Sequence, residues 1–226
     1  ETPNYCGLSK AQIKLYEQAV KAMQEGLANS DGMARRGLVL QTLMRLKQIC
    51  NHPSQFTGTG EFTPSDSGKF VRISELCQEV SERQEKVLVF TQFKEIIEPL
   101  SDHLATIFGR PGLILHGQTK IKERQQLVER FQQEDGPPFF VLSLKAGGTG
   151  LTLTQASHVI HFDRWWNPAV ENQATDRAFR LGQKRNVLVH KLITRGTLEE
   201  RIDDVITKKQ RVADEILESE SEINLT

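Results

Sequence analysis

From Gly68 onward, short runs of apolar, β-favouring residues alternate with segments of helical character. Helices of roughly ten to fifteen residues are expected between these runs, which lie at 87–90, 113–115, 139–142, 159–160 and 187–189. Strands that are joined by helices run parallel, and a parallel sheet has to be covered on both faces. The sequence therefore predicts an α/β fold with a parallel sheet and helices on both faces.

The part before Gly68 has a different pattern. Residues 8–27, with Ser9 as a possible N-terminal cap, and a second stretch that ends at Asn51 both carry apolar residues at helical spacing. Residues 54–68 are rich in glycine and small polar residues, which predicts a flexible connection and the best internal boundary. At the other end of the chain, residues 197–217 predict one long polar helix.

The composition excludes several classes of protein. No run approaches the roughly 18 apolar residues of a membrane span, and the amino end has no basic stretch that leads into an apolar core, as a secretory signal would. The three cysteines are far apart and form no CxxC pair, so we expect neither a disulfide framework nor a zinc site. Free thiols of this kind are typical of a reducing compartment.

Charge is unevenly distributed although the net charge is zero. Residues 164–195 hold seven basic and two acidic residues, whereas the segment from Thr197 onward is acidic. Such a basic stripe can bind phosphate while an acidic tail hides it in the total. Two solvated helix faces would give the same pattern.

Polar and glycine-rich clusters follow four of the predicted strands. These clusters are Thr91-Gln92, His116-Gly117, Lys145 to Gly150, and Asp163-Arg164-Trp165-Trp166. In an open α/β sheet, ligands bind beyond the carboxyl ends of the strands. The four clusters together therefore predict a binding site along one edge of the sheet.

The glycine-rich cluster could bring backbone amides close to a phosphate, because Gly147, Gly148 and Gly150 have no side chains to obstruct it. A tight structural turn is the other interpretation. No GxxxxGK[ST] loop occurs in the chain, so the part that cradles the phosphates of Mg-ATP in P-loop enzymes is missing.

Residues 168–181 predict a well-capped helix, with Asn167 before it and Gly182 after it. Gln173, Arg177 and Arg180 are spaced i, i+4 and i+7, so they share one face. Such a face suits a phosphate-bearing ligand, and a surface face paired with neighbouring acids is the alternative.

One pair of histidines and one pair of tryptophans say less about the function. His158 and His161 are three apart on a strand and point to opposite faces, which excludes a shared metal site. We expect one of Trp165 and Trp166 to lie in the core and the other to be partly exposed, as a core anchor or as a surface on which bases stack.

Taken together, these clusters resemble the second RecA-like lobe of the Swi/Snf family within helicase superfamily two. The resemblance spans nearly the whole chain in the family's order. Residues 90–93 (FTQF) resemble motif IV, 143–154 (SLKAGGTGLTLT) motif V, 163–169 (DRWWNPA) its extension, and 173–183 (QATDRAFRLGQ) motif VI. Residues 47–53 (KQICNHP) are similar to the end of the family's helical protrusion, and 196–202 (GTLEERI) to the start of its brace helix.

The resemblance implies ATP-driven translocation on double-stranded DNA that remodels protein–DNA complexes. It assigns the catalytic arginine fingers to Arg177 and Arg180. The residues implied to bind ATP are Gln173, Gly148, Thr149 and Gly150, and those implied to bind DNA are Thr91, Gln92, His116, Lys145, Ala146, Gly147, Trp165 and Trp166. ATP and Mg²⁺ would be held mainly by a first lobe, and no metal ligand is expected in this chain.

The resemblance also divides the chain. It implies a helical protrusion and connection at 1–67, a RecA-like lobe at 68–196, and a brace helix with an acidic tail at 197–226. The phosphate loop and acidic metal motif of a first lobe are absent from the sequence, so we expect no ATP hydrolysis by the lobe alone. The implied partners are double-stranded DNA, an N-terminal RecA-like lobe of the same protein and a DNA-bound protein cargo. No membrane is expected as a partner. The implied location is the cytoplasm or nucleoid of a prokaryote, or the nucleus of a eukaryote.

Two other functions were compared with this one. A non-catalytic helicase-like module that binds DNA or protein would predict altered arginine positions, yet Arg177 and Arg180 are both present. An unrelated dinucleotide enzyme would require a GxGxxG turn after the first strand, where the chain has Thr91-Gln92-Phe93.

Overall fold

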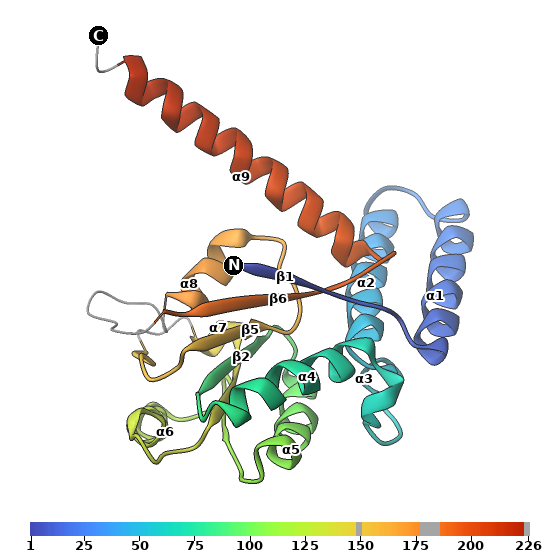
Figure 1. The fold of residues 1–226 in the computed structure, drawn as a ribbon. Coiled ribbons are helices and arrows are strands. Elements are labelled where there is room, and N and C mark those ends of the chain that lie inside the picture. Colours follow the sequence, from blue (N-terminus) through green and yellow to red (C-terminus); the bar gives the residue numbers. More distant parts are fainter. Residues whose placement is uncertain (148–150, 177–185, 224–226) are drawn as a thin grey trace.

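The computed structural model describes residues 1–147, 151–176 and 186–223. At its centre lies a six-stranded parallel sheet with the strand order β1-β6-β5-β2-β4-β3 (Figure 1). The strands are β1 (Thr2–Cys6), β2 (Val87–Thr91), β3 (Leu113–Leu115), β4 (Phe139–Ser143), β5 (His158–His161) and β6 (Leu188–Thr194). The α/β fold with a parallel sheet is therefore confirmed.

Helices cover both faces of this sheet, as the sequence predicts. The helices of the described residues are α1 (Lys10–Ala28), α2 (Gly32–Asn51), α3 (Pro53–Thr57), α4 (Gly68–Glu82), α5 (Ile97–Phe108), α6 (Ile121–Gln132), α7 (Leu144–Gly147), α8 (Pro168–Thr175) and α9 (Leu198–Ile223), of which α4 and α5 cover one face of the sheet and α6, α7 and α8 the other. Two 3₁₀ turns, Pro64–Asp66 and Lys94–Ile96, precede α4 and α5. Within the described residues, no helix is long and apolar enough to span a bilayer.

Strand β1 was not predicted. It pairs with β6 at the edge of the sheet, and of its five residues only Asn4 and Cys6 are buried. So short and polar a segment carries little β signal of its own, because its pairing depends on a strand that lies more than 180 residues further along the chain. Residues 2–6 thus belong to the sheet, although the sequence analysis assigned them to the helical part.

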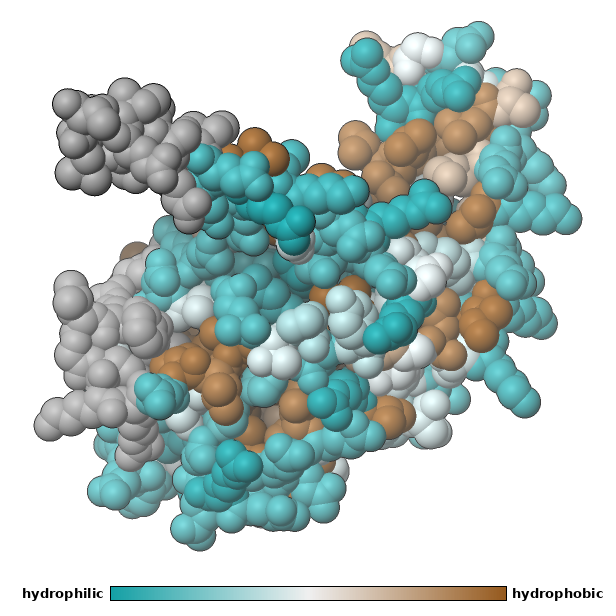
Figure 2. Space-filling model, turned by 45° about the horizontal axis from the view of Figure 1, so that its top comes forward, coloured by the Kyte–Doolittle hydropathy of each residue, from teal (hydrophilic) through white to brown (hydrophobic). Residues whose placement is uncertain are grey.

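The helical part consists of α1 and α2, which lie side by side (Figure 1). Ser9 caps α1 as predicted, and Gln12 completes a capping box with it. Gln12 also donates hydrogen bonds to the carbonyls of Ile49 and Cys50 at the end of α2, which fixes the two helices to each other. Hydrophobic side chains gather on the exposed surface of this part (Figure 2). The exposed large hydrophobic residues of α2 are Met33, Leu40 and Met44.

The connection at residues 54–68, predicted as flexible, contains α3 and a 3₁₀ turn. His52 Nε2 lies 2.8 Å from the carbonyl oxygen of Thr63, and the Ser67 hydroxyl donates to the carbonyl of Asn51 over 2.6 Å. Ser67 also caps α4. These side chains satisfy backbone groups of the connection, and the composition of the segment did not predict its two helical turns.

Among the described residues, helix α9 packs against the rest of the protein near its start. Leu198, Ile202 and Ile206 are buried against α2 in a small hydrophobic cluster. From Thr207 to Glu215 every residue is exposed, and the helix projects away from the lobe (Figure 1). It runs to Ile223, six residues beyond the predicted end.

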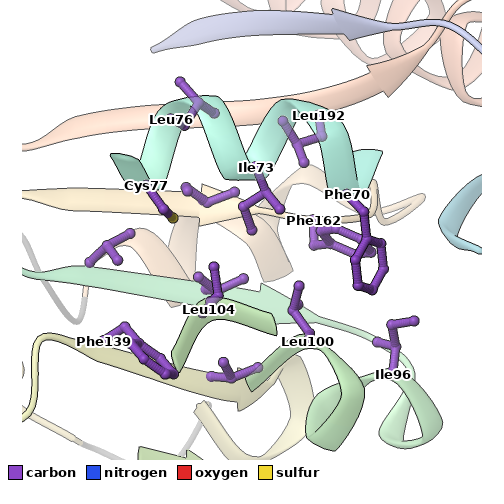
Figure 3. Close-up of a cluster of buried hydrophobic side chains, with 14 of the residues drawn as sticks. Phe70, Ile73, Leu76, Cys77, Ile96, Leu100, Leu104, Phe139, Phe162 and Leu192 are labelled. Carbon is purple, nitrogen blue, oxygen red and sulfur yellow. The ribbon is translucent and has the colours of Figure 1, made fainter. Parts of the chain in front are cut away.

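Two hydrophobic clusters hold the lobe together, one on each face of the sheet. Alternation along β2 sends Val87 and Val89 into the cluster under α4 and α5, and Leu88 and Phe90 into the cluster under α6, α7 and α8. Figure 3 shows the first cluster, in which side chains of α4 and α5 meet those of the strands. All residues of β2, β4 and β5 are buried, so the sheet forms a rigid base for the loops at its carboxyl edge.

Candidate functional site

The four polar clusters predicted to share one edge do so. Strands β5, β2, β4 and β3 are consecutive neighbours in the parallel sheet, so their carboxyl ends lie next to one another. The register brings Thr91 opposite Ser143, and Phe90 opposite His161. This edge is therefore one continuous surface built from segments that lie far apart in the sequence.

At the end of β2, Thr91 and Gln92 differ in what they offer a ligand. Thr91 is fully buried, and its hydroxyl donates to Asp163 Oδ2 over 2.5 Å, so its side chain positions the loop and does not face solvent. The Gln92 backbone amide donates to Asp163 Oδ1 over 2.9 Å. Among the described residues, neither side-chain amide atom of Gln92 has a hydrogen-bond partner although both are buried. An unpaired buried amide is costly, so this side chain is suited to receive a ligand group.

At the end of β3, His116 begins a turn that side chains of α6 and of the turn itself stabilise. Arg124 of α6 donates to the carbonyl oxygens of Gly117 and Thr119 over 3.2 and 2.9 Å. The His116 backbone amide donates to the Thr119 hydroxyl, and the imidazole is partly buried. Because side chains hold the turn so closely, a ligand would meet a preformed surface there.

At the end of β4, Lys145, Ala146 and Gly147 form the short helix α7. The Ser143 hydroxyl accepts a hydrogen bond from the Ala146 amide over 3.2 Å. Lys145 is exposed, whereas Ala146 is buried and could meet a ligand only through its backbone. The other predicted members of this loop, Gly148, Thr149 and Gly150, lie outside the described residues.

At the end of β5, the two tryptophans differ in burial, but neither lies in the core as was expected of one of them. Trp165 packs against the second hydrophobic cluster, and Trp166 is 42% exposed. The buried ammonium group of Lys47 lies 5.7 and 5.1 Å from their ring centroids, within the range of cation–π attraction. Trp166 also lines a groove of about 610 Å³ between α9 and the helices α1 and α2.

Helix α8 bears one of the predicted nucleotide contacts. Asn167 caps it as predicted, since its Oδ1 accepts from the Ala169 amide over 3.0 Å, and Pro168 occupies the first turn. Gln173 is exposed on this helix. The helix is described to Thr175, whereas it was predicted to reach Leu181. Arg177 and Arg180, the predicted arginine fingers, lie outside the described residues.

A set of buried charged side chains beneath this edge was not predicted. We call it the buried ionic network. It consists of Lys47, Lys69, Asp163, Arg164, Glu171, Lys191, Glu199 and Asp203. Its members come from α2, α4, the loop after β5, α8, β6 and α9, so it connects the β5 end of this edge to the helical part and to α9.

Asp163 links the edge to one half of this network. Its carboxylate accepts from Thr91, from the Gln92 amide and, over 3.1 Å, from Asn51 Nδ2. Asn51 Oδ1 in turn accepts from Lys69 Nζ over 3.0 Å, and Lys69 forms a 2.6 Å ion pair with Glu199 of α9. The end of β2 and the start of α9 are thus connected through consecutive hydrogen bonds.

Burial sets the electrostatics of these groups. Burial raises the pKa of Asp163, although Lys69 and Lys47 oppose the effect. Burial also opposes the charge on Lys69, but Glu199 and Asp163 outweigh it and raise the pKa of Lys69 above its usual value. Burial lowers the pKa of Lys47. Charges removed from water in this way need partners in fixed positions, so the network holds the loops in one arrangement.

One feature of the sequence could have indicated the network. Lys47 lies four residues after Leu43 and three before Cys50, on the same apolar stripe of its helix. A lysine at such a position predicts a buried partner. The partners themselves are distant in sequence and could not be identified from spacing.

The described residues contain no group of three or more histidine, cysteine or acidic side chains that could hold a metal ion. Cys6, Cys50 and Cys77 are free and buried.

Comparison with known proteins identifies similar chains. The helicase conserved C-terminal domain family matches residues 69–182. A protein of Bacillus subtilis described as a putative ATP-dependent helicase/translocase, YwqA, is 46% identical over 98% of this chain and 24% of its own length. This chain thus spans about a quarter of that relative.

Two solved structures from Sulfolobus solfataricus share the fold. Its SWI2/SNF2 ATPase C-terminal domain is 37% identical, with a TM-score of 0.79 over 92% of this chain and 85% of its own. The SWI2/SNF2 ATPase core in complex with double-stranded DNA is 39% identical, with a TM-score of 0.84 over 96% of this chain and 46% of its own.

Proposed function

This chain belongs to the helicase conserved C-terminal domain family, and from that premise we propose that it is the second motor lobe of an ATP-dependent translocase. The translocase would move along double-stranded DNA and remodel protein–DNA complexes. The similarity to a helicase/translocase and to SWI2/SNF2 ATPases over nearly the whole chain supports this proposal. Translocation would take place in the nucleoid of a prokaryote or in the nucleus of a eukaryote, where the DNA is.

The observation that carries the proposal is the continuous edge formed by β5, β2, β4 and β3. It combines an exposed cation at Lys145, a partly exposed aromatic ring at Trp166 and the buried side-chain amide of Gln92, which has no hydrogen-bond partner within the described part of the chain. A cation attracts backbone phosphate, and an amide or a backbone N–H positions it. We propose that this edge follows one strand of the duplex. The similar Sulfolobus core was solved with double-stranded DNA, which supports this choice of ligand.

The nucleotide would lie between this lobe and a first lobe that holds most of the ATP and Mg²⁺. Gln173 is exposed on α8, and Arg177 and Arg180 follow in the sequence. We propose that both arginines meet the phosphates from this side. An arginine that stabilises charge on the transferring phosphoryl group raises the rate on the order of 10³- to 10⁵-fold. Without a first lobe the chain would then bind DNA but not hydrolyse ATP.

DNA binding by the chain itself tests the proposed edge. Lys145→Ala should weaken affinity for a short duplex regardless of sequence and reduce the slope of log K against log salt by about one. Lys14→Ala removes the same charge from an exposed position on α1 and is the matched control. Equal effects of the two substitutions, or no measurable binding by the wild type, would contradict the proposed DNA edge.

A further inference from the structure

Arg164 connects three elements from a position that is almost fully buried. Its Nε donates to Glu171 Oε1 of α8 over 2.9 Å, and its Nη1 donates to Asp203 Oδ1 of α9. Its backbone carbonyl accepts from Lys47 of α2. The Arg164 side chain is 2% exposed, so the two carboxylates take the place of solvent around it.

We propose that Arg164 is a positioning residue that couples α9 to α8, so that the seating of α9 on the lobe controls the alignment of α8 and of the Trp165-Trp166 loop. The proposal rests on the proposed function, in which α8 carries the nucleotide contact Gln173.

The two ends of the coupling differ in strength. Glu171 is fully buried and accepts from both Arg164 and the Trp165 backbone amide, while Lys191 lies 3.5 Å from its other oxygen. Asp203 is 19% exposed, and Arg164 is its ion-pair partner among the described residues. A guanidinium that loses a buried partner is strongly destabilised, whereas a partly exposed carboxylate can return to water. A movement of α9 should therefore break the ion pair between Arg164 and Asp203 and leave the ion pair between Arg164 and Glu171 intact.

Helix α8 has a second anchor close to its end. Thr175 Oγ1 lies 3.0 Å from His161 Nε2 on β5, and His161 is fully buried against Phe90. With Glu171 at one end and Thr175 at the other, α8 can shift only together with the end of β5.

The shape of α9 suits it to act as a lever. Its seat consists of Leu198, Ile202 and Ile206, with Glu199 and Asp203 on the polar side. Beyond Ile206 it continues to Ile223, a projecting arm of about 25 Å at the rise of an α-helix. A force on this arm is resisted by the first turns of α9, and Asp203 lies in the second of these turns.

The two tryptophans of the chain provide a direct readout, because both follow Arg164 immediately and no others occur in the sequence. Asp203→Asn removes the acceptor charge at the α9 end. Asp204→Asn makes the same change at the neighbouring exposed residue and serves as the matched control. Asp203→Glu retains the charge. We expect the emission spectrum and acrylamide quenching of the chain to change in Asp203→Asn, to stay unchanged in Asp204→Asn, and to return toward wild type in Asp203→Glu.

Hydrogen exchange in α8 distinguishes coupling from simple loss of stability. Coupling predicts faster exchange in Pro168–Thr175 for Asp203→Asn while exchange in β2 and β4 stays at the wild-type rate. A purely structural role would accelerate exchange throughout the lobe. That result, or unchanged tryptophan emission in Asp203→Asn, would overturn the proposal.

The natural full-length protein adds a catalytic readout. Asp203→Asn should lower kcat for DNA-stimulated ATP hydrolysis roughly tenfold, the factor expected when one charged hydrogen bond is lost, with little change in the KM for ATP. Asp204→Asn should match the wild type, and a wild-type kcat in Asp203→Asn would contradict the coupling. If the wild type itself showed no DNA-stimulated hydrolysis, the proposed function would fail, while the fluorescence and exchange results would still decide whether α9 and α8 are coupled.

Discussion

The ion pair between Lys69 and Glu199 allows a quantitative test of the buried ionic network. Both side chains have no exposed surface, and Nζ lies 2.6 Å from Oε2. Glu199 Oε1 also accepts from the Thr194 amide, and Lys69 Nζ donates to Asn51. The pair therefore joins α4, α2, β6 and the first turn of α9. Glu199→Gln keeps the size and one acceptor oxygen but removes the charge that faces Lys69.

Breaking a buried ion pair from one side costs about 3–5 kcal/mol, because the remaining charge is left without its partner. For a domain of this size each kcal/mol lowers Tm by about 2–4 °C. The Tm of Glu199→Gln should therefore fall by roughly 10 °C. Lys69→Met should have a similar effect, since it leaves Glu199 charged and removes the donor that pairs with Asn51 Oδ1. The double variant leaves neither charge of the pair alone, so its loss should be smaller than the sum of the two by about 2 kcal/mol.

Urea denaturation followed by circular dichroism measures the free energy of unfolding for the wild type, both single variants and the double variant. Glu129→Gln, at an exposed position on α6, is the control and should stay within about 0.5 kcal/mol of the wild type. Strict additivity of the two substitutions, or a loss below about 1 kcal/mol for either one, would show that the pair does not hold these elements together.

The remaining predictions concern His161 of β5, two glycines and the tryptophans. Burial lowers the pKa of His161 to about 4, so its contribution to stability is present above its unfolded pKa of about 6.5 and is lost as the pH falls toward 4. Between pH 7 and pH 5 the wild type should lose about 2 kcal/mol more than His161→Phe in urea denaturation, and equal losses would refute this. A Cβ at Gly68 would lie 1.8 Å from the carbonyl oxygen of Gly7, whereas one at Gly37 in α2 would meet no atom within 4 Å. Gly68→Ala should therefore lower Tm sharply and Gly37→Ala should raise stability by about 0.5–1 kcal/mol; the reverse order would contradict the packing. Trp165→Ala should cost about 3 kcal/mol and Trp166→Ala clearly less, and equal costs in urea would be inconsistent with their different burial.

Local patterns were sufficient to predict most of the fold. The apolar runs at 87–90 and 139–142 mark β2 and β4, and the caps at Ser9 and Asn167 mark the starts of α1 and α8, because each signal lies within a few residues of the element that it specifies. The same holds for the edge of the sheet. Once the strands are parallel, residues that follow them must gather on one side.

Interactions between distant residues could not be predicted in this way. Strand β1 depends on β6, and Lys69 depends on Glu199, which lies 130 positions further along the chain. Thr91 shows the limit at the site itself. Its place after a strand predicts a ligand contact, but the structure commits its hydroxyl to Asp163. The roles of Arg177 and Arg180 remain predictions that rest on the resemblance and the family.

ATP hydrolysis by the natural full-length protein, measured with and without duplex DNA, tests the central claim most directly. The comparison is between the wild type and Arg180→Ala, with nucleotide binding measured in parallel. We predict that DNA stimulates the wild type and that Arg180→Ala loses turnover by on the order of 10³-fold while it still binds nucleotide. Turnover that DNA does not stimulate, or that survives the substitution unchanged, would contradict the assignment of this chain as the lobe that supplies the arginine finger.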